Sequence, residues 1–224
     1  MEIITDEQND EHCFIKYIPN FLDQSYIDNI LEELKGYDYI GGKTDYGTDI
    51  PRVQKWMHND NQPFSLLWKK QFARWQPKNY TPHIRNLQDN IIEIYSRKYK
   101  LPEYAKTPKI NSSLVNTYRD GKDSISFHRD NLPEFGINPT IMVVSFGETR
   151  KIQFRRVKYN ILNPKSMKLD NDLQHQNFNI DLEEGSLLVM GGVTQKYFAH
   201  GIDKCSTNNI RYSITFREHA SVNY

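Results

Sequence analysis

Residues 116–130 read N-T-Y-R-D-G-K-D-S-I-S-F-H-R-D, and this stretch ends in His128-Arg129-Asp130. Side chains two residues apart on an extended strand point to the same face, so His128 and Asp130 can aim at one point. An imidazole and a carboxylate are two of the three ligands of the 2-His-1-carboxylate triad, which holds non-haem Fe(II) and leaves its other positions open. Because an isolated His-x-Asp also occurs by chance in soluble proteins, a third ligand from elsewhere in the chain is needed.

The C-terminal part of the chain supplies a candidate for that ligand. His200 lies in the segment Y-F-A-H-G, and the alternative interpretation is a partly buried structural histidine. A strictly alternating segment, R-Y-S-I-T-F-R, follows at 211–217. Read as a strand, it presents two arginines and two hydroxyls on one face and an apolar row on the other. The alternative is a half-exposed strand with its charges in water, but paired guanidinium groups also suit a dicarboxylate, which arginine binds bidentately.

Together these segments resemble the AlkB family of Fe(II)- and 2-oxoglutarate-dependent dioxygenases, which remove alkyl groups from nucleobases. The resemblance covers roughly residues 15–218 and is closest in pattern to the animal DNA-repair homologues. It rests on an ordered set of motifs: Pro51-Arg52-x-Gln54, Asn116-x-Tyr118, Asp120-Gly121, His128-Arg129-Asp130, Val144-Ser145-Phe146-Gly147, Phe154-Arg155, Gly185-Ser186-Leu187-Leu188, His200 and Arg211-x-x-x-Thr215-Phe216-Arg217. One position departs from the pattern, because Ser213 stands where the family usually has Asn.

The resemblance implies roles for these residues. His128, Asp130 and His200 would bind Fe(II); Arg211 and Tyr118 would bind the C5 carboxylate of 2-oxoglutarate, and Asn116 and Arg217 its C1 end, with Thr215 assisting. The implied reaction is oxidative dealkylation of N1-methyladenine and N3-methylcytosine in DNA, coupled to decarboxylation of 2-oxoglutarate to succinate and release of formaldehyde. The alternatives are an RNA demethylase, or an AlkB-like module that acts on a protein or has altered chemistry.

Substrate contacts follow from the same resemblance. A base in a duplex must be extruded and stacked between side chains before chemistry. Trp68 is expected to stack on it, with Phe72 and Trp75 as competitors and core packing as the alternative for Trp68. Further expected contacts are Arg52, Gln54, Arg129, Asn131, Glu134 and Ser213. An apolar finger that fills the gap left by the base is expected at Tyr39, Ile40 and Gly41.

Charge is distributed unevenly along the chain. The 224 residues carry 29 Lys plus Arg and 28 Asp plus Glu, so the net charge of +1 gives no global nucleic-acid signature. The segment 150–168, however, contains only basic charged residues. A solvated face is the common explanation for such a run, but its place beside the expected site favours phosphate contact. The candidates are Arg150, Lys151, Arg155, Arg156 and Lys158.

The density of short strands with polar turns predicts a mainly β sandwich or barrel. The resemblance implies an α+β, mainly β fold: a double-stranded β-helix (jelly-roll) with N-terminal helices packed outside. We expect residues 1–11 to be disordered, 12–108 to form the helices and a nucleotide-recognition region, and 109–220 to form the jelly-roll core. Helices are predicted after Asp23 or Ser25, ending at Gly36, and after Thr81-Pro82. The predicted strands of the core are 110–118, 124–128, 140–147, 151–157, 178–182, 186–190, 195–200 and 209–217.

Other features of the sequence exclude several classes of protein. Two cysteines without a spacing motif, Cys13 and Cys205, argue against a disulfide framework or a zinc site. An acidic N-terminus without an apolar region gives no signal peptide, and no apolar run approaches the roughly 20 residues of a membrane span. We therefore expect an intracellular protein, in the nucleus or cytoplasm, that binds no membrane, and we expect a monomer. The resemblance implies that it binds nucleic acid, DNA rather than RNA.

Overall fold

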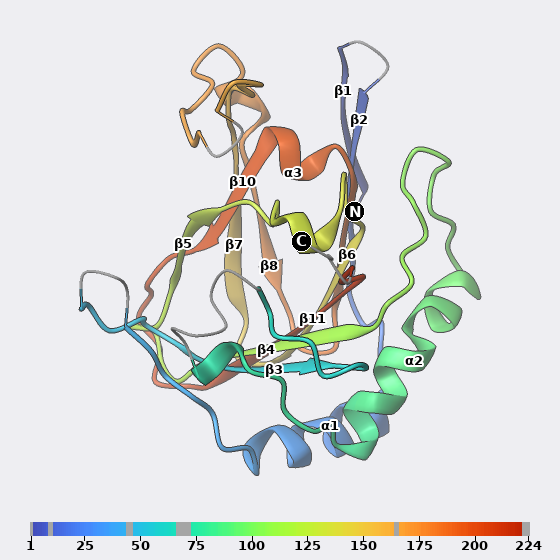
Figure 1. Ribbon diagram of the computed structural model, residues 1–224, viewed down its shortest axis with the longest axis vertical. Helices are drawn as coiled ribbons and strands as arrows, with labels where there is room; N and C mark the ends of the chain where they lie inside the picture. Colours follow the sequence, from blue (N-terminus) through green and yellow to red (C-terminus); the bar gives the residue numbers. More distant parts are fainter. Residues whose placement is uncertain (1, 9–10, 44–46, 66–72, 164–165, 221–224) are drawn as a thin grey trace.

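Two antiparallel sheets face each other in the computed structural model, which describes residues 2–8, 11–43, 47–65, 73–163 and 166–220 (Figure 1). The larger sheet has the strand order β1-β2-β9-β6-β11-β4-β3, and the smaller one β5-β10-β7-β8. The strands of the larger sheet are β1 (Glu2–Gln8), β2 (Glu11–Ile18), β3 (Val53–His58), β4 (Ser112–Tyr118), β6 (Ile141–Gly147), β9 (Leu187–Gly192) and β11 (Arg211–Arg217). Those of the smaller sheet are β5 (Ile125–His128), β7 (Arg150–Arg156), β8 (Phe178–Leu182) and β10 (Phe198–Ile202).

Each sheet contributes one face to a shared apolar core. This core joins residues of the larger sheet to residues of the smaller one, for example Ile15, Leu188 and Met190 to Phe154 and Phe198. The arrangement is the expected jelly-roll, a mainly β fold of the α+β class. Side chains from the two sheets meet in the space between them.

Two long helices cover the outer face of the larger sheet. The helices α1 (Gln24–Lys35) and α2 (Pro82–Ser96) lie together along that face (Figure 1). Their apolar rows, including Ile30 and Ile91, pack in one cluster with the outward-facing Ile214 and Phe216 of β11. None of the helices in the described part of the chain is long and apolar enough to cross a membrane.

The predicted strands of the core are found with ends shifted by up to two residues, except at one place. The segment 195–200 begins instead with a single helical turn, α3 (Thr194–Tyr197), and its strand β10 starts only at Phe198. Three short 3-10 turns, η1 (Ala73–Trp75), η2 (Pro133–Phe135) and η3 (Gln174–Gln176), complete the elements. Strand β3 was not predicted, although it pairs with β4 along its whole length.

The N-terminal segment differs from the expectation of disorder over residues 1–11. Glu2–Gln8 forms β1, which is hydrogen-bonded antiparallel to β2 with a register shift between Thr5 and Gln8. The strand β2 in turn pairs with β9, so the hairpin extends the larger sheet at one edge. An edge strand needs no apolar alternation to satisfy its backbone groups, and the acidic composition of this segment therefore hid it.

Both predicted helix starts are confirmed, but one is capped in an unexpected way. Asp23 accepts the amide of Tyr26 at 2.9 Å, as an N-cap does. Thr81 makes no cap of this kind, and the first-turn amides of α2 are instead bound by Glu33 of α1. His83 N donates to Glu33 Oε1 at 2.9 Å and Ile84 N to Oε2 at 3.1 Å. Burial alone would raise the pKa of Glu33, but these hydrogen bonds lower it below its usual value.

Replacing Glu33 by Ala should therefore lower the free energy of unfolding by about 1–2 kcal/mol, because two amides and the positive end of a helix lose their partner. The carboxylate binds its partners in the folded state only, which is why folding lowers its pKa. The extra stability of the wild type over Glu33→Ala should therefore be complete at pH values above the ordinary glutamate pKa of 4.5 and should disappear as the pH falls below it. Urea denaturation at several pH values measures this. Glu32→Ala, an exposed position on the same helix, is the matched control, and equal destabilisation by both variants would contradict the capping role.

Candidate functional site

A cavity of about 440 Å³ lies between the two sheets. Its lining combines polar side chains of β4, β10 and β11 with apolar ones of β6, β7, β8 and β9, and with segments that flank the sheets. All eight residues predicted to bind metal or 2-oxoglutarate line this cavity: Asn116, Tyr118, His128, Asp130, His200, Arg211, Thr215 and Arg217. The structure thus brings together groups that are separated by up to 101 residues in the sequence.

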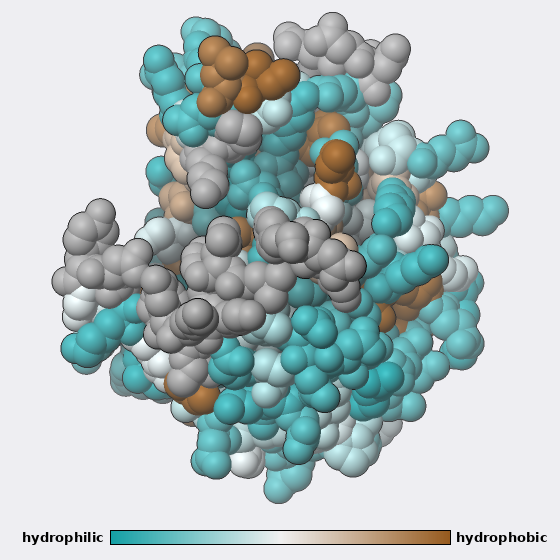
Figure 2. Space-filling view, in the orientation of Figure 1, coloured by the Kyte–Doolittle hydropathy of each residue, from teal (hydrophilic) through white to brown (hydrophobic). Residues whose placement is uncertain are grey.

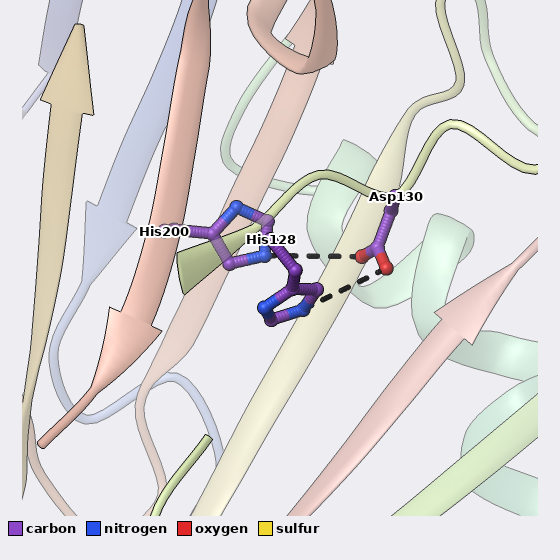
Figure 3. A group of neighbouring side chains, drawn as sticks. All are labelled: His128, Asp130 and His200. Atoms are coloured by element: carbon purple, nitrogen blue, oxygen red, sulfur yellow. Dashed lines mark ion pairs between the residues drawn. The ribbon is translucent and has the colours of Figure 1, made fainter. Parts of the chain in front are cut away.

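The three metal-ligand candidates meet at one point of this cavity. His128 ends β5 and is the direct cross-strand partner of His200 on β10, while Asp130 follows two residues later (Figure 3). Potential ligand atoms of the three residues all lie within 4.8 Å of one another. Asp130 Oδ1 is 3.9 Å from His128 Nε2, and its Oδ2 is 3.9 Å from His200 Nε2. Gln195 Oε1 accepts the Asp130 amide at 2.8 Å and holds this backbone in place.

Both imidazoles are prepared to act as neutral ligands. The Nδ1 of His128 is 2.9 Å from the carbonyl oxygen of Ser126, which can only accept, so this nitrogen carries the hydrogen and Nε2 keeps its lone pair. Burial lowers the pKa of His128, and it lowers the pKa of His200 to about 3. Burial would raise the pKa of Asp130, but the nearby guanidinium groups, foremost that of Arg217, help to outweigh this effect, and the pKa is lowered. Two neutral nitrogens and one carboxylate form the donor set that suits Fe(II).

The two arginines of β11 have hydrogen-bond donors to spare. Arg211 is buried to 1 % exposure and gives one N–H to Ser145 Oγ at 3.0 Å, and Arg217 lies 3.4 Å from Asp130 Oδ2. Within the described residues, Nε and Nη1 of both side chains have no hydrogen-bond partner. Burial lowers the pKa of both groups, that of Arg211 to about 10. A buried guanidinium without partners is costly, so these donors fit an anionic ligand such as a dicarboxylate.

Asn116 is oriented by two residues that the sequence assigned to substrate contact. Its Oδ1 accepts from Gln54 Nε2 at 2.7 Å and from Arg52 Nε at 3.2 Å. A guanidinium can only donate, so the amide oxygen must face Arg52, and the Nδ2 group is left to donate to a ligand in the cavity. Arg52 and Gln54 therefore orient the side chain of Asn116, and both also line the cavity.

Several expected substrate contacts lie elsewhere. Glu134 is 1 % exposed and accepts from Ser65 at 2.7 Å, so it cannot reach a base. Asn131 is exposed outside the cavity lining, whereas Arg129 and Ser213 contribute to that lining. Trp68 and Phe72 lie outside the described residues. Trp75, the remaining aromatic candidate, lines the cavity and stacks on Phe64 with ring centroids 4.1 Å apart.

The predicted finger is not a projecting element. Tyr39 packs against the core beneath α1 and donates its hydroxyl to the carbonyl of Leu34 at 2.7 Å. Ile40 exchanges two backbone hydrogen bonds of 3.1 Å with Gln54, which fixes this segment to the edge of β3. Gly41 is exposed next to it. Because backbone and side chain are both bound to the body of the protein, Tyr39 and Ile40 cannot act as a wedge.

The phosphate-contact candidates divide into two groups. Arg150 and Arg156 are only 2 % and 3 % exposed, which corrects the prediction for both. Arg150 donates to the carbonyls of Asp120, Asp123 and Asp203, and Arg156 lies over the ring of Tyr197 at 4.5 Å. Lys151 and Lys158 are exposed but paired with Asp181 and Asp172. Arg155 is half-buried with its guanidinium 3.9 Å from the ring centre of Phe127, a cavity residue.

The sequence interpretation missed some supporting residues. Ser145, which accepts a hydrogen bond from Arg211, lies on β6 directly opposite Ser213 of β11. The alternation of Val144-Ser145-Phe146 could have indicated that its side chain points into the cavity. Gln195 carries no such signal, because it belongs to the helical turn that replaces the expected strand. Phe64 and Leu132 line the cavity from irregular segments, where no periodicity indicates direction.

Comparisons with known proteins agree with this geometry. A family model described as the 2OG-Fe(II) oxygenase superfamily matches residues 14–217. The alpha-ketoglutarate-dependent dioxygenase alkB homolog 3 of Mus musculus is 29% identical over 204 residues, covering 89% of this chain and 64% of that protein. The DNA oxidative demethylase ALKBH2 of Arabidopsis thaliana is 26% identical over 159 residues, covering 65% of this chain and 48% of that protein.

A solved structure shares the fold. The structure of OsALKBH1 superposes with a TM-score of 0.58 over 97% of this chain and 100% of that one, at 14% sequence identity. The chain spans less than two thirds of the length of the curated relatives named above.

Metal binding should depend only weakly on pH just below the ordinary histidine pKa of 6.5, because burial lowers the pKa of His128 and lowers that of His200 to about 3. We expect the affinity for Co(II), measured by titration calorimetry, to stay level as the pH falls through this value. If the affinity for Co(II) instead fell about tenfold per pH unit for each imidazole below pH 6.5, the histidines would not be neutral as expected. His128→Ala should abolish binding, and His175→Ala, an exposed histidine of η3, should leave it unchanged.

Proposed function

The chain belongs to the AlkB family of the 2OG-Fe(II) oxygenase superfamily, and from this premise we propose that it removes alkyl groups oxidatively from nucleobases in DNA. Membership implies Fe(II) and 2-oxoglutarate as cofactors. The proposal rests on one observation: the ligand set His128, Asp130 and His200 lines the same cavity as two buried arginines that have unused hydrogen-bond donors. These arginines are Arg211 and Arg217.

The cofactor half of the reaction is assigned to the floor of this cavity. His128, Asp130 and His200 would hold Fe(II) on one face, which leaves positions for 2-oxoglutarate and dioxygen. When bound, the metal would activate dioxygen, which is the oxidant both for the conversion of 2-oxoglutarate to succinate and carbon dioxide and for the oxidation of the alkyl group. Arg211, with Tyr118 beside it, would bind the C5 carboxylate, and Arg217, Thr215 and the Nδ2 of Asn116 would bind the C1 end.

The substrate half is assigned to the cavity mouth. An extruded base needs an aromatic or apolar surface on which to stack, and Trp75, Phe127 and Leu132 offer one within the lining. Oxidation of a methyl group on N1 of adenine or N3 of cytosine would release it as formaldehyde and restore the pairing edge. N1-methyladenine and N3-methylcytosine in DNA are therefore the proposed substrates, and the relatives named as DNA oxidative demethylases support DNA over RNA.

The decisive experiment loads the protein anaerobically with Fe(II) and 2-oxoglutarate and then adds air with an N1-methyladenine oligonucleotide. We expect demethylation with formaldehyde and succinate in equal amounts. Asp130→Ala should lower the rate by at least about a hundredfold, since a charged ligand of the metal is lost. Asp181→Ala, an exposed carboxylate on β8, is the matched control and should keep the wild-type rate.

Parallel substrates separate the alternatives. The same strand is supplied as DNA and as RNA, and a methylated peptide is supplied at equal concentration. Faster turnover of the RNA strand than of the DNA strand would show that the substrate is RNA. Succinate formation stimulated by the peptide alone would overturn the proposal and favour a protein-directed relative.

Arg211→Lys should raise the KM for 2-oxoglutarate by about tenfold or more and leave kcat closer to wild type. Lysine keeps the charge but loses the planar pair of donors that a carboxylate binds. Steady-state succinate production at varied 2-oxoglutarate measures both constants. Arg119→Lys, which changes a partly exposed arginine paired with Asp123, is the control. An unchanged KM in Arg211→Lys would place the C5 carboxylate elsewhere.

A further inference from the structure

Exposed apolar side chains concentrate in the loop between β7 and β8. Eight large apolar residues of the described chain are exposed, and five of them lie in this loop: Tyr159, Ile161, Leu162, Met167 and Leu169. Ile161 is 76% exposed and Leu162 93%, and the loop forms an apolar patch on an otherwise mainly hydrophilic upper surface (Figure 2). Single exposed apolar residues are common on soluble proteins, but a cluster on one projecting tip is typical of an interaction site.

The tip is held in a defined conformation. Asn160 Oδ1 accepts the amides of Leu162 at 2.9 Å and Asn163 at 3.3 Å, which closes a turn with Ile161 and Leu162 at its outside. The base of the loop is closed by the bridge between Val157 and Leu169 and by the bond from Lys158 N to Lys168 O at 2.9 Å. Two aliphatic side chains are thus presented to solvent at a turn that hydrogen bonds close.

Arg129 connects this loop to the metal-ligand site. Its Nη2 donates to the carbonyl of Ser166 at 2.9 Å, and its Nη1 donates to the carbonyl of Lys196 at 3.0 Å. Arg129 stands between the ligands His128 and Asp130 and itself lines the cavity. Ser166 of the loop is therefore hydrogen-bonded to a residue that lines the cavity, and Arg129 joins the loop to the site.

The charges around the tip suit a polyanion. No acidic residue occurs between Arg150 and Leu169 in the sequence. Lys168 is exposed, without an ion pair to any described residue, and Arg155 lies over Phe127 at the cavity. Lys158 is partly neutralised by Asp170 and Asp172, which lie in the same loop, C-terminal to its apolar tip. An apolar tip flanked by cations matches a duplex, whose base stack is apolar and whose phosphates surround it.

We propose that Ile161 and Leu162 form the wedge with which this protein opens a nucleic-acid duplex, inserting into the stack beside the extruded nucleotide while Lys168 and Arg155 contact phosphates. This inference rests on the proposed function, because it assigns the duplex contact of the same site. A protein partner or a membrane could also cover the tip, but neither accounts for its attachment to the cavity through Arg129.

Three variants test the wedge. Ile161→Ser with Leu162→Ser removes the apolar tip, and Ile161→Leu with Leu162→Ile keeps its volume and should behave like the wild type. Ile137→Ser is the matched control, because this isoleucine is 91% exposed on a different loop. Each is assayed on an N1-methyladenine strand, alone and in a duplex. The double Ser variant should lose about tenfold in duplex turnover, since unstacking is no longer compensated, and keep the single-strand rate. An unchanged ratio of duplex to single-strand turnover would overturn the wedge.

A binding measurement separates this inference from the proposed function. An unmodified duplex with 2-aminopurine at the target position reports unstacking by fluorescence and requires no chemistry. The wild type, the volume-conserving variant and Ile137→Ser should raise the signal, and the double Ser variant should not. Equal signals from all four proteins, or no rise with any of them, would overturn the wedge. Absence of demethylation on either strand would instead overturn the proposed function, while the fluorescence still decides on the wedge.

Discussion

Strand β11 is hydrogen-bonded along its length on both sides, to β4 and to β6, and this double pairing determines where the site can form. A shift of one residue in its register would exchange its two faces. In the observed register Tyr212, Ile214 and Phe216 pack beneath the helices, and the arginines at both ends turn into the cavity. The apolar row thus fixes the polar row, because the register cannot change without burying two guanidinium groups in the outer core.

The electrostatics of the cavity follow from burial combined with missing partners. Arg150 is as deeply buried as Arg211, yet its donors reach three backbone carbonyls, so it is a structural residue. Among the described residues, Arg211 donates to Ser145 Oγ and lies beside the ring of Tyr118, Arg217 pairs with the carboxylate of Asp130, and Nε and Nη1 of both arginines have no hydrogen-bond partner. Burial therefore does not identify a ligand-binding arginine; unused donors do. Asp130 is the only carboxylate among the described residues that line the cavity, which also include Arg52, Arg129, Arg211 and Arg217. An anion in the cavity would therefore relieve the excess charge and satisfy the donors together.

Residues with a strict period were predictable, and residues that depend on three-dimensional neighbours were not. The alternation of 211–217 and the two-residue spacings of 116–118 and 128–130 indicate direction directly, and the cavity contains these side chains. Strand β3 was not predictable in this way, because Val53–His58 has polar and apolar residues on both faces. Its backbone pairing with β4 makes it a strand. The positions of Arg150, Arg156 and Glu134 could not be deduced either, because a charged side chain in the sequence carries no sign of the carbonyls, rings or hydroxyls that will bury it.

The same distinction separates the two halves of the cavity. The proposed cofactor half is built on paired strands, where a substitution must respect register and core packing, and Gln54 and Arg52 extend this order to the amide of Asn116. The proposed substrate half comprises Trp75, Leu132 and the loop held by Arg129, which lie outside the strands, where length and composition are less constrained. Proteins with this fold can therefore keep one oxidising centre and change what it acts on, because the elements that carry each task are constrained by different contacts.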